Sequence, residues 1–195
     1  KGDVGMEQEL TQPLFIDFEA SSLNMDSYPI EVAWSLEDGS IESHLINIHE
    51  IKSWRDWDSY SQSIHGISKQ QLFEEGKHPK WVAQRMNDVL ADKVLLTNAY
   101  EFDLDWCETL FKATDEDMDF TFGDAWHVFG RHLNMKSLAE NDMLEQQLNS
   151  ESLYEELTNV SEKAWKRVTG EQHRASVDVQ QLIEMWTMVT TKRGD

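Results

Sequence analysis

The stretch Pro13-Leu14-Phe15-Ile16-Asp17-Phe18-Glu19 decides how the rest of the chain is interpreted. It predicts a buried strand of about six residues, because an apolar run follows the proline and ends at Ala20-Ser21-Ser22. Side chains alternate along a strand, so Asp17 and Glu19 share one face with Phe15, and the other apolar residues share the opposite face. Two neighbouring buried carboxylates repel each other, so they require a counter-charge, a shared proton or a metal ion.

Length and composition favour one globular domain. The chain has 195 residues, of which 39% are hydrophobic and 28% are charged, enough for a sizeable core. We expect a tail over residues 1–12 and a single domain over residues 13–192; residues 1–5, before Met6, are set aside as a candidate cloning remnant. No apolar run reaches the ~18 to 20 residues of a membrane span, and no signal peptide is visible, so we expect a cytoplasmic protein with no membrane partner.

The charge balance is unusual for a protein that handles nucleic acid. Acidic residues number 37 and basic residues 17, for a net charge of −20, whereas strong nucleic-acid binders usually carry a basic surface. Either the substrate is not nucleic acid, or metal ions and backbone groups offset phosphate repulsion locally. A local basic track is one source of such offset; its candidates are Arg131, Lys136, Lys163, Lys166, Arg167 and Arg174.

The single Cys107 excludes an internal disulfide and a cysteine-based zinc site, and we interpret it as a packing residue.

The first half of the chain predicts an antiparallel start to a sheet. Strands over residues 30–36 and 41–48 are joined by Glu37-Asp38-Gly39-Ser40, and an Asp-Gly pair between apolar runs is a strong hairpin signal. Residues 49–66 read as a long surface segment, and Ser68 caps a short helix through Phe73.

The second half alternates helices with strands. The pattern predicts a helix from Pro79 to about Asp92, a strand over 94–97, a helix over 103–111, a strand over 119–122 and a helix that starts at Asp124. Residues 136–168 are polar and helical but hard to place. A final helix over 173–190 has an apolar stripe with Asp178 at its border. The order favours an α/β or α+β fold with a mixed sheet.

Four carboxylates now stand at element ends: Asp17, Glu19, Asp103 and Asp178. Each has an ordinary interpretation, because Asp103 could merely start a helix and Asp178 could form a surface ion pair. His173 could be an exposed residue at a helix start. Together, however, the carboxylates offer the oxygen ligands that Mg²⁺ and Mn²⁺ prefer, and two-metal sites hold such ions ~3.5 to 4 Å apart.

Three segments resemble the exonuclease motifs of the DEDDh superfamily: Asp17-Phe18-Glu19, then Asn98-Ala99-Tyr100-Glu101-Phe102-Asp103, then His173-Arg174-Ala175-Ser176-Val177-Asp178. That superfamily has a ribonuclease H-like fold and includes RNase T, oligoribonuclease and the proofreading subunit of replicative DNA polymerase. The resemblance spans Leu14 to Trp186. It implies a mixed five-stranded sheet with a three-stranded antiparallel start, flanked by helices, and a 3′→5′ exonuclease.

The resemblance also implies roles for the site residues. Asp17, Glu19 and Asp178 would ligate one of two Mg²⁺ or Mn²⁺ ions, and Asp17 would bridge to the second with help from Asp103. His173 would be the general base, a role that suits an imidazole near neutral pH.

Substrate contacts are implied less fully. The family's Thr-Thr/Ser-Gly-Leu is replaced by Ala20-Ser21-Ser22-Leu23. Leu23 matches the residue that wedges against the terminal base, and the backbone of Ala20 to Ser22 could still meet the 3′ end. His65 lies in a segment resembling one that lines the nucleotide pocket, and Phe102 could stack on a base. We therefore expect single-stranded DNA or RNA 3′ ends as substrate and nucleoside monophosphates as product, and a homodimer by analogy with relatives.

Two other functions stay open. The charge favours an acidic interaction module that kept the fold without significant catalysis. Endonucleolytic cleavage of RNA in hybrids is a lesser alternative, against which the His173 to Asp178 spacing argues.

Weaker motifs are interpreted as ordinary features. Asp115-Glu116-Asp117-Met118-Asp119 imitates a calcium loop but has Phe120 where the sixth position needs Gly. His127 and His132 do not share one helix face and are not expected to be ligands. Trp54 and Trp57 could stack on bases, although tryptophans are mostly core residues.

Overall fold

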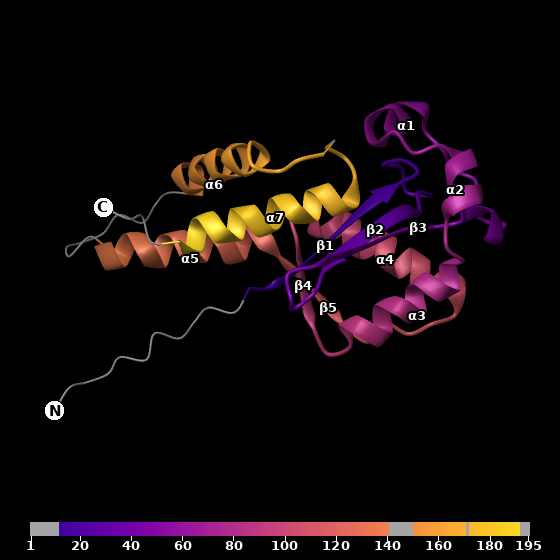
Figure 1. The fold of residues 1–195 in the computed structure, drawn as a ribbon, viewed down its shortest axis with the longest axis horizontal. Helices are drawn as coiled ribbons and strands as arrows, with labels where there is room; N and C mark the ends of the chain where they lie inside the picture. Colours follow the sequence, from indigo (N-terminus) through magenta and orange to yellow (C-terminus); the bar gives the residue numbers. More distant parts are fainter. Residues whose placement is uncertain (1–11, 141–149, 171, 192–195) are drawn as a thin grey trace.

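The computed structural model describes residues 12–140, 150–170 and 172–191. A mixed sheet of strand order β3-β2-β1-β4-β5 lies at its centre (Figure 1). The strands are β1 (Leu14–Ala20), β2 (Pro29–Ser35), β3 (Ile41–Leu45), β4 (Val94–Thr97) and β5 (Thr121–Asp124). β1, β2 and β3 are antiparallel neighbours, while β4 and β5 run parallel to β1. This confirms the predicted five-stranded mixed sheet with its antiparallel start.

Helices cover both faces of the sheet (Figure 1). In chain order they are η1 (Ile48–Glu50), α1 (Ser59–His65), α2 (Lys69–Glu75), α3 (Pro79–Leu90), α4 (Tyr100–Thr114), α5 (Ala125–Glu140), α6 (Ser150–Trp165) and α7 (Ala175–Thr190). α3 and α4 pack on one face, α5 and α7 on the other, and α6 packs on α7. None of the helices in the described ranges is long and apolar enough to cross a lipid bilayer.

Side chains of β1 are buried on both faces of the sheet, as the alternation of its residues predicted. Ile16 and Phe18 are buried in the cluster that contains α3 and α4. Phe15 points the other way and packs against Phe129 of α5, with ring centroids 5.9 Å apart. Cys107 is buried in the first cluster, in agreement with a packing role. The acidic face of β1 is therefore the face that α7 covers.

Several predicted boundaries were wrong. β3 ends at Leu45, and Ile46 forms an isolated bridge with Lys77. β5 is displaced by two residues toward the C-terminus. The surface segment over 49–66 contains α1, whose start is capped by Asp58 through the amides of Tyr60 and Ser61.

The structure assigns helices to part of the segment that the sequence pattern did not resolve. The part of residues 136–168 that the structure describes contains the end of α5 and all of α6. Residues 1–11 of the expected tail, and residue 192 at the predicted domain end, lie outside the described residues.

Candidate active site

β1 delivers two carboxylates to the carboxyl end of the sheet. Asp17 lies opposite Ala33 of β2, and Glu19 lies opposite Glu31. The pairing of β1 with β4 is limited to Leu14 and Phe15, so the two strands separate before they reach Asp17. Ligand sites in sheets of this kind commonly lie where neighbouring strands diverge at their carboxyl ends.

The junction between β4 and α4 positions a third carboxylate. The hydroxyl of Thr97, the last residue of β4, donates to Asp103 and accepts a hydrogen bond from the amide of Ala99 at 3.0 Å. α4 begins at Tyr100 and not at Asp103 as predicted, so Asp103 lies in the first turn and is only 1% exposed. An acidic residue that only stabilises a helix start is usually exposed, so the burial of Asp103 indicates a further role.

The fourth carboxylate and the histidine come from the start of α7. The helix begins at Ala175, so the prediction that it begins at His173 was wrong. His173 instead has a left-handed backbone, with φ of 63°, in the loop before the helix. Donor atoms of Glu19, His173 and Asp178 all lie within 4.8 Å of one another.

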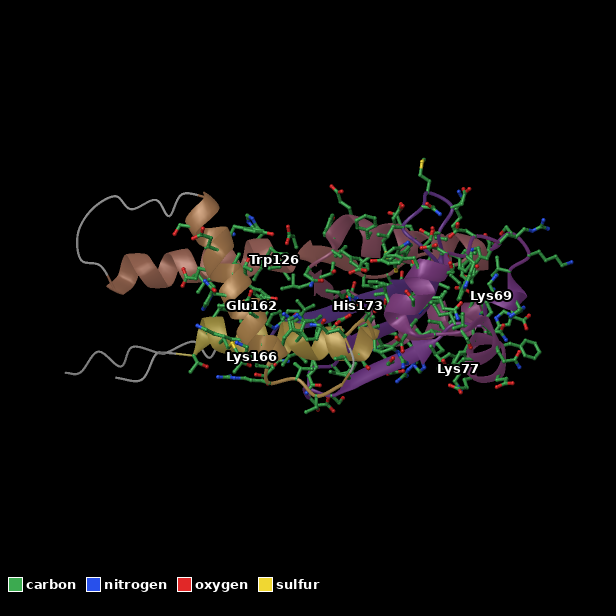
Figure 2. All side chains as sticks on the ribbon, turned by 90° about the horizontal axis from the view of Figure 1, so that it is seen from above. Lys69, Lys77, Trp126, Glu162, Lys166 and His173 are labelled. Atoms are coloured by element: carbon green, nitrogen blue, oxygen red, sulfur yellow. The ribbon has the colours of Figure 1, made fainter. Side chains whose placement is uncertain are left out.

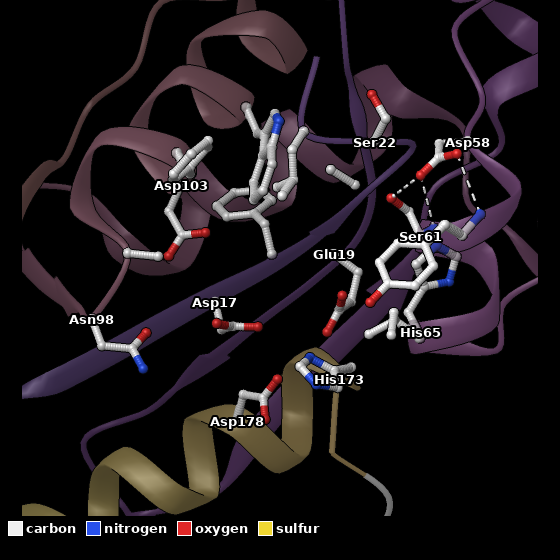
Figure 3. Close-up of a pocket in the computed structure, with 18 of the residues that line it drawn as sticks. Asp17, Glu19, Ser22, Asp58, Ser61, His65, Asn98, Asp103, His173 and Asp178 are labelled. Atoms are coloured by element: carbon white, nitrogen blue, oxygen red, sulfur yellow. Dashed lines mark hydrogen bonds between the residues drawn. The ribbon is translucent and has the colours of Figure 1, made fainter. Parts of the chain in front are cut away.

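These segments, far apart in sequence, meet at one cavity. Figure 3 shows Asp17 between Asp103 and Asp178, with Glu19 and His173 beside them. All five predicted catalytic residues line this cavity of about 680 Å³. Three buried carboxylate oxygens, Asp17 Oδ2, Asp103 Oδ1 and Asp178 Oδ1, have no hydrogen-bond partner among the described residues.

Burial and mutual repulsion favour the protonated forms of these carboxyl groups. Burial, with Asp103 and Asp178 nearby, raises the pKa of Asp17 well above its ordinary value. Burial, with Asp178 and Glu31 nearby, raises the pKa of Glu19 to about 8. Burial also raises the pKa values of Asp103 and Asp178 to about 7, although hydrogen bonds partly offset the effect. Without a counter-cation, the cluster therefore holds protons near neutral pH.

Most of the predicted substrate-binding residues line the same cavity: Ala20, Ser22, Leu23, His65 and Phe102. Ser21 does not; it is buried, and its hydroxyl donates to Asp56 at 2.9 Å. The side chains of Leu23 and Phe102 are 72% and 48% exposed, so apolar surface stands open at the cavity. Exposed apolar side chains at a cavity mouth are suited to contact with a ligand.

His65 lines the cavity and keeps one buried hydrogen-bond donor without a protein partner among the described residues. Its Nδ1 accepts from the amide of Ile67 at 3.0 Å, so the ring hydrogen is on Nε2. Within the described residues Nε2 has no partner, although it is buried. Burial lowers the pKa of this imidazole to about 4, so the ring is neutral at physiological pH.

The two loop tryptophans have protein partners. Trp54 stacks on Tyr28 with ring centroids 5.0 Å apart, and Trp57 donates to Gln62 and lies under Lys69. Neither lines the cavity. The structure thus gives both rings a packing role.

The suggested basic track is broken at two positions. Arg174 forms an ion pair with Glu31 at 2.7 Å, and Arg167 lies 3.6 Å from Glu184. The side chain of Lys136 lies outside the described ones. Figure 2 shows Lys166 on one side of His173 and Lys69 on the other.

Sequence reasoning missed three supporting residues and one wall of the cavity. Glu31 lies opposite Glu19, and the hydroxyl of Thr97 donates to Asp103. Asp56 accepts hydrogen bonds from Ser21, Ser22 and Asn24. Trp165, at the end of α6, lines the cavity. Polar residues at strand ends were the available signal for Thr97, but Glu31 is hidden within an apolar strand and Trp165 has no local signature.

Comparison with known proteins identifies the family. The model of the RNase T family, described as exonuclease, matches residues 14–186. The chain belongs to the RNase T exonuclease family. This membership confirms the resemblance to 3′→5′ exonucleases of the DEDDh superfamily and identifies the chain as an exonuclease by family. A comparison with curated proteins found no match.

Solved structures support the fold of this RNase T family member. The zinc-bound complex of E. coli exonuclease I with single-stranded DNA matches with a TM-score of 0.64 and 17% identity, over 92% of this chain and 40% of that chain. E. coli exonuclease I with a dA16 oligonucleotide matches with a TM-score of 0.63 and 18% identity, over 93% and 41%. The chain thus spans about two fifths of the exonuclease I structures, and the likeness confirms the ribonuclease H-like fold.

The carboxylates and the histidine that line the cavity are suited to binding a divalent cation. The three unpartnered carboxylate oxygens are hard donors of the kind that Mg²⁺ and Mn²⁺ take. The imidazole of His173, beside Glu19 and Asp178, also makes a donor set that Zn²⁺ accepts. A bound cation would offset the burial and the mutual repulsion that raise the carboxyl pKa values.

The raised pKa values predict how stability depends on pH in this RNase T family member. Between about pH 4 and pH 8, the folded metal-free protein binds more protons at Glu19, Asp103 and Asp178 than the unfolded chain does. Stability therefore falls as pH rises through this window. We expect the melting temperature in chelator to fall from pH 5 to pH 8, and Mn²⁺ to raise it more at pH 8 than at pH 5, because ligands must lose their protons to bind. A flat or rising melting temperature in chelator would contradict this.

Proposed function

We propose that this chain is a divalent-metal-dependent 3′→5′ exonuclease that releases nucleoside monophosphates from single-stranded DNA or RNA ends. The observation that carries the proposal is the convergence of Asp17, Glu19, Asp103, His173 and Asp178 on one cavity, with three buried carboxylate oxygens free for a cation. Two carboxylate-held cations are the arrangement that clamps the attacking and leaving oxygens in phosphodiester hydrolysis.

Each site residue then has a role. Asp17, Glu19 and Asp178 would hold one Mg²⁺ or Mn²⁺ ion, and Asp17 with Asp103 would hold the second. Bound there, the ions supply an activated water and offset the charge on the leaving 3′ oxygen. His173 is exposed and lies beside Glu19 and Asp178, so its imidazole can accept the proton of the attacking water. Thr97 keeps Asp103 oriented.

The cavity also suits a strand end. Leu23 offers an exposed apolar side chain to the terminal base, and Phe102 offers an aromatic surface. The Nε2 hydrogen of His65 is a fixed donor for a sugar or phosphate oxygen. The exonuclease I structures with single-stranded DNA support a single-stranded substrate for this chain.

Net charge does not prevent binding in this proposal. Bound cations would offset the negative charge of the substrate phosphate at the site. Before the cations bind, protonation of the carboxyl groups limits their repulsion of the phosphate. The cytoplasmic location and the homodimer expected from the sequence stay predictions.

The charge of −20 supports one other candidate, an acidic interaction module that kept the fold. Digestion separates the two. Oligonucleotides of matched sequence, as single-stranded DNA and RNA labelled at the 5′ end, are incubated with the protein and Mg²⁺, Mn²⁺, Zn²⁺ or chelator. We expect stepwise shortening from the 3′ end and released mononucleotides with Mg²⁺ or Mn²⁺ only. Intact oligonucleotides under every condition would refute the exonuclease and favour the interaction module.

A further inference from the structure

Glu31 is a buried carboxylate that the proposed reaction does not use. It lies on β2, is 1% exposed, and stands directly opposite Glu19 on β1. Opposite residues of an antiparallel pair project from the same face, and like charges there destabilise the sheet. Glu31 must therefore have a compensating partner.

Arg174 is that partner, and the contact is bidentate. Its Nε lies 3.0 Å from Oε2 of Glu31, and its Nη2 lies 2.7 Å from Oε1. The same Oε2 also accepts the amide of Ala175, the first residue of α7, at 3.0 Å. Paired hydrogen bonds of this kind fix orientation as well as distance. Glu31 thus holds both a side chain and the backbone at the start of the helix.

The segment held in this way carries two proposed site residues. His173 directly precedes Arg174 and has φ of 63°, a conformation that few non-glycine residues adopt unless the surroundings impose it. Gly170 lies on the other side of His173, with φ of 139°, where a Cβ atom would come 2.7 Å from Val177 of α7. Asp178 follows one turn into the helix. The loop is therefore fastened to the fold at Arg174 and packed closely at Gly170.

We propose that Glu31 and Arg174 are positioning residues: their ion pair holds the loop before α7 so that His173 and Asp178 meet Glu19. The inference rests on the proposed function, because it explains how that site is assembled. Breaking the ion pair lets the loop relax from its left-handed conformation and moves the imidazole and the Asp178 carboxylate away from Glu19. Substrate contacts at Leu23 and Phe102 come from other elements, so binding of the strand is affected less than turnover.

A matched ion pair elsewhere separates positioning from general stability. Glu42 of β3 accepts two hydrogen bonds from Arg85 of α3, at 2.8 and 2.9 Å. Like the Glu31 pair, it joins a strand to a helix or its N-cap through a bidentate guanidinium, and the two arginine side chains are similarly exposed, 38% for Arg85 and 36% for Arg174. The Glu42 side chain is more exposed than that of Glu31, 18% against 2%, so the melting temperature is compared together with activity. Neither Glu42 nor Arg85 lines the cavity.

The test compares Arg174→Ala, Arg174→Lys and Arg85→Ala with wild type, in kcat, KM for single-stranded oligonucleotide and melting temperature. We expect Arg174→Ala to lower kcat about 10- to 100-fold, the range typical of groups that orient metal ligands, with KM within about threefold. Arg174→Lys should retain part of the activity. Since Arg174 is partly exposed, added guanidinium should enter the gap and restore part of the kcat of Arg174→Ala. Arg85→Ala should keep the wild-type kcat and show no response to guanidinium.

Arg174→Ala leaves a buried carboxylate unpaired and could unfold. The double variant Glu31→Gln with Arg174→Gln removes both charges and keeps polar side chains, so it provides a folded alternative. A kcat within about twofold of wild type in the double variant would overturn the proposal. So would equal losses in Arg174→Ala and Arg85→Ala.

The proposal can fail independently of the proposed function. If the wild type digests no substrate, the exonuclease assignment fails, and calorimetric titration with Mn²⁺ alone decides on the ion pair. Weaker Mn²⁺ binding by about tenfold in the double variant, but not in Arg85→Ala, supports positioning of the acidic cluster. Equal Mn²⁺ affinity in the double variant and wild type overturns it.

Discussion

Asp17→Asn is expected to abolish metal-dependent digestion, with a loss of at least about 10³-fold, while it stabilises the metal-free protein. Asp17 is 7% exposed and lies between Asp103 and Asp178, so it is placed to serve both cations (Figure 3). The amide fills the same volume but lacks the negative charge that a cation requires. Its neutrality also removes the cost of burying a charge and the repulsion from Asp103 and Asp178, the two effects that raise the pKa of Asp17 in the wild type. At pH 8 in chelator, we expect a melting temperature higher by roughly 3–6 °C, equivalent to about 1–2 kcal/mol in a chain of this size.

Asp105→Asn is the matched control. Asp105 lies two residues after Asp103 on the same helix but is exposed and does not line the cavity. It should leave both digestion and melting temperature near the wild-type values. Digestion by Asp17→Asn at more than about a tenth of the wild-type rate would remove Asp17 from the proposed metal site. A melting temperature of Asp17→Asn below that of the wild type in chelator would contradict the expected electrostatic stabilisation, but it would not affect the role of Asp17 in the metal site.

His173→Asn is expected to lower kcat by about 10²- to 10⁴-fold, the usual contribution of a general base, with little change in KM. Asparagine is chosen because it tolerates the left-handed backbone at this position better than most residues. The variant therefore removes the imidazole while it preserves the loop. Single-turnover digestion of a short oligonucleotide at saturating Mn²⁺ measures the chemical step directly.

His127→Asn serves as the control, because His127 is exposed on α5 and does not line the cavity. Its activity should match the wild type. A loss confined to Mn²⁺ affinity in His173→Asn, with normal kcat at saturation, would make His173 a ligand, consistent with its closeness to Glu19 and Asp178. Unchanged kcat and Mn²⁺ affinity would exclude both roles.

The carboxylates of the site, and most of the strands and helices that carry them, could be predicted from the local sequence. Alternation along β1 separated Phe15 from Ile16 and put Asp17 beside Glu19, because a strand has a fixed two-residue period. The Asp38-Gly39 pair specified the β2–β3 hairpin, because few residues adopt that turn. The order and spacing of the three motifs indicated the family, since motif spacing is a property of the chain itself.

Tertiary structure alone decided how these residues meet. The left-handed backbone of His173, the Asp103 Oδ1 atom without a hydrogen-bond partner and the pairing of Glu31 with Arg174 depend on segments that are far apart in the sequence. No local pattern encodes such contacts, because their energy comes from burial and from the geometry of neighbouring elements. The sequence by itself determined which acids and which histidine this protein carries and on which elements. The packing of α7 against β1 and β2, together with the junction between β4 and α4, brought these residues into one site, because burial and mutual repulsion of the carboxylates are properties of the folded chain.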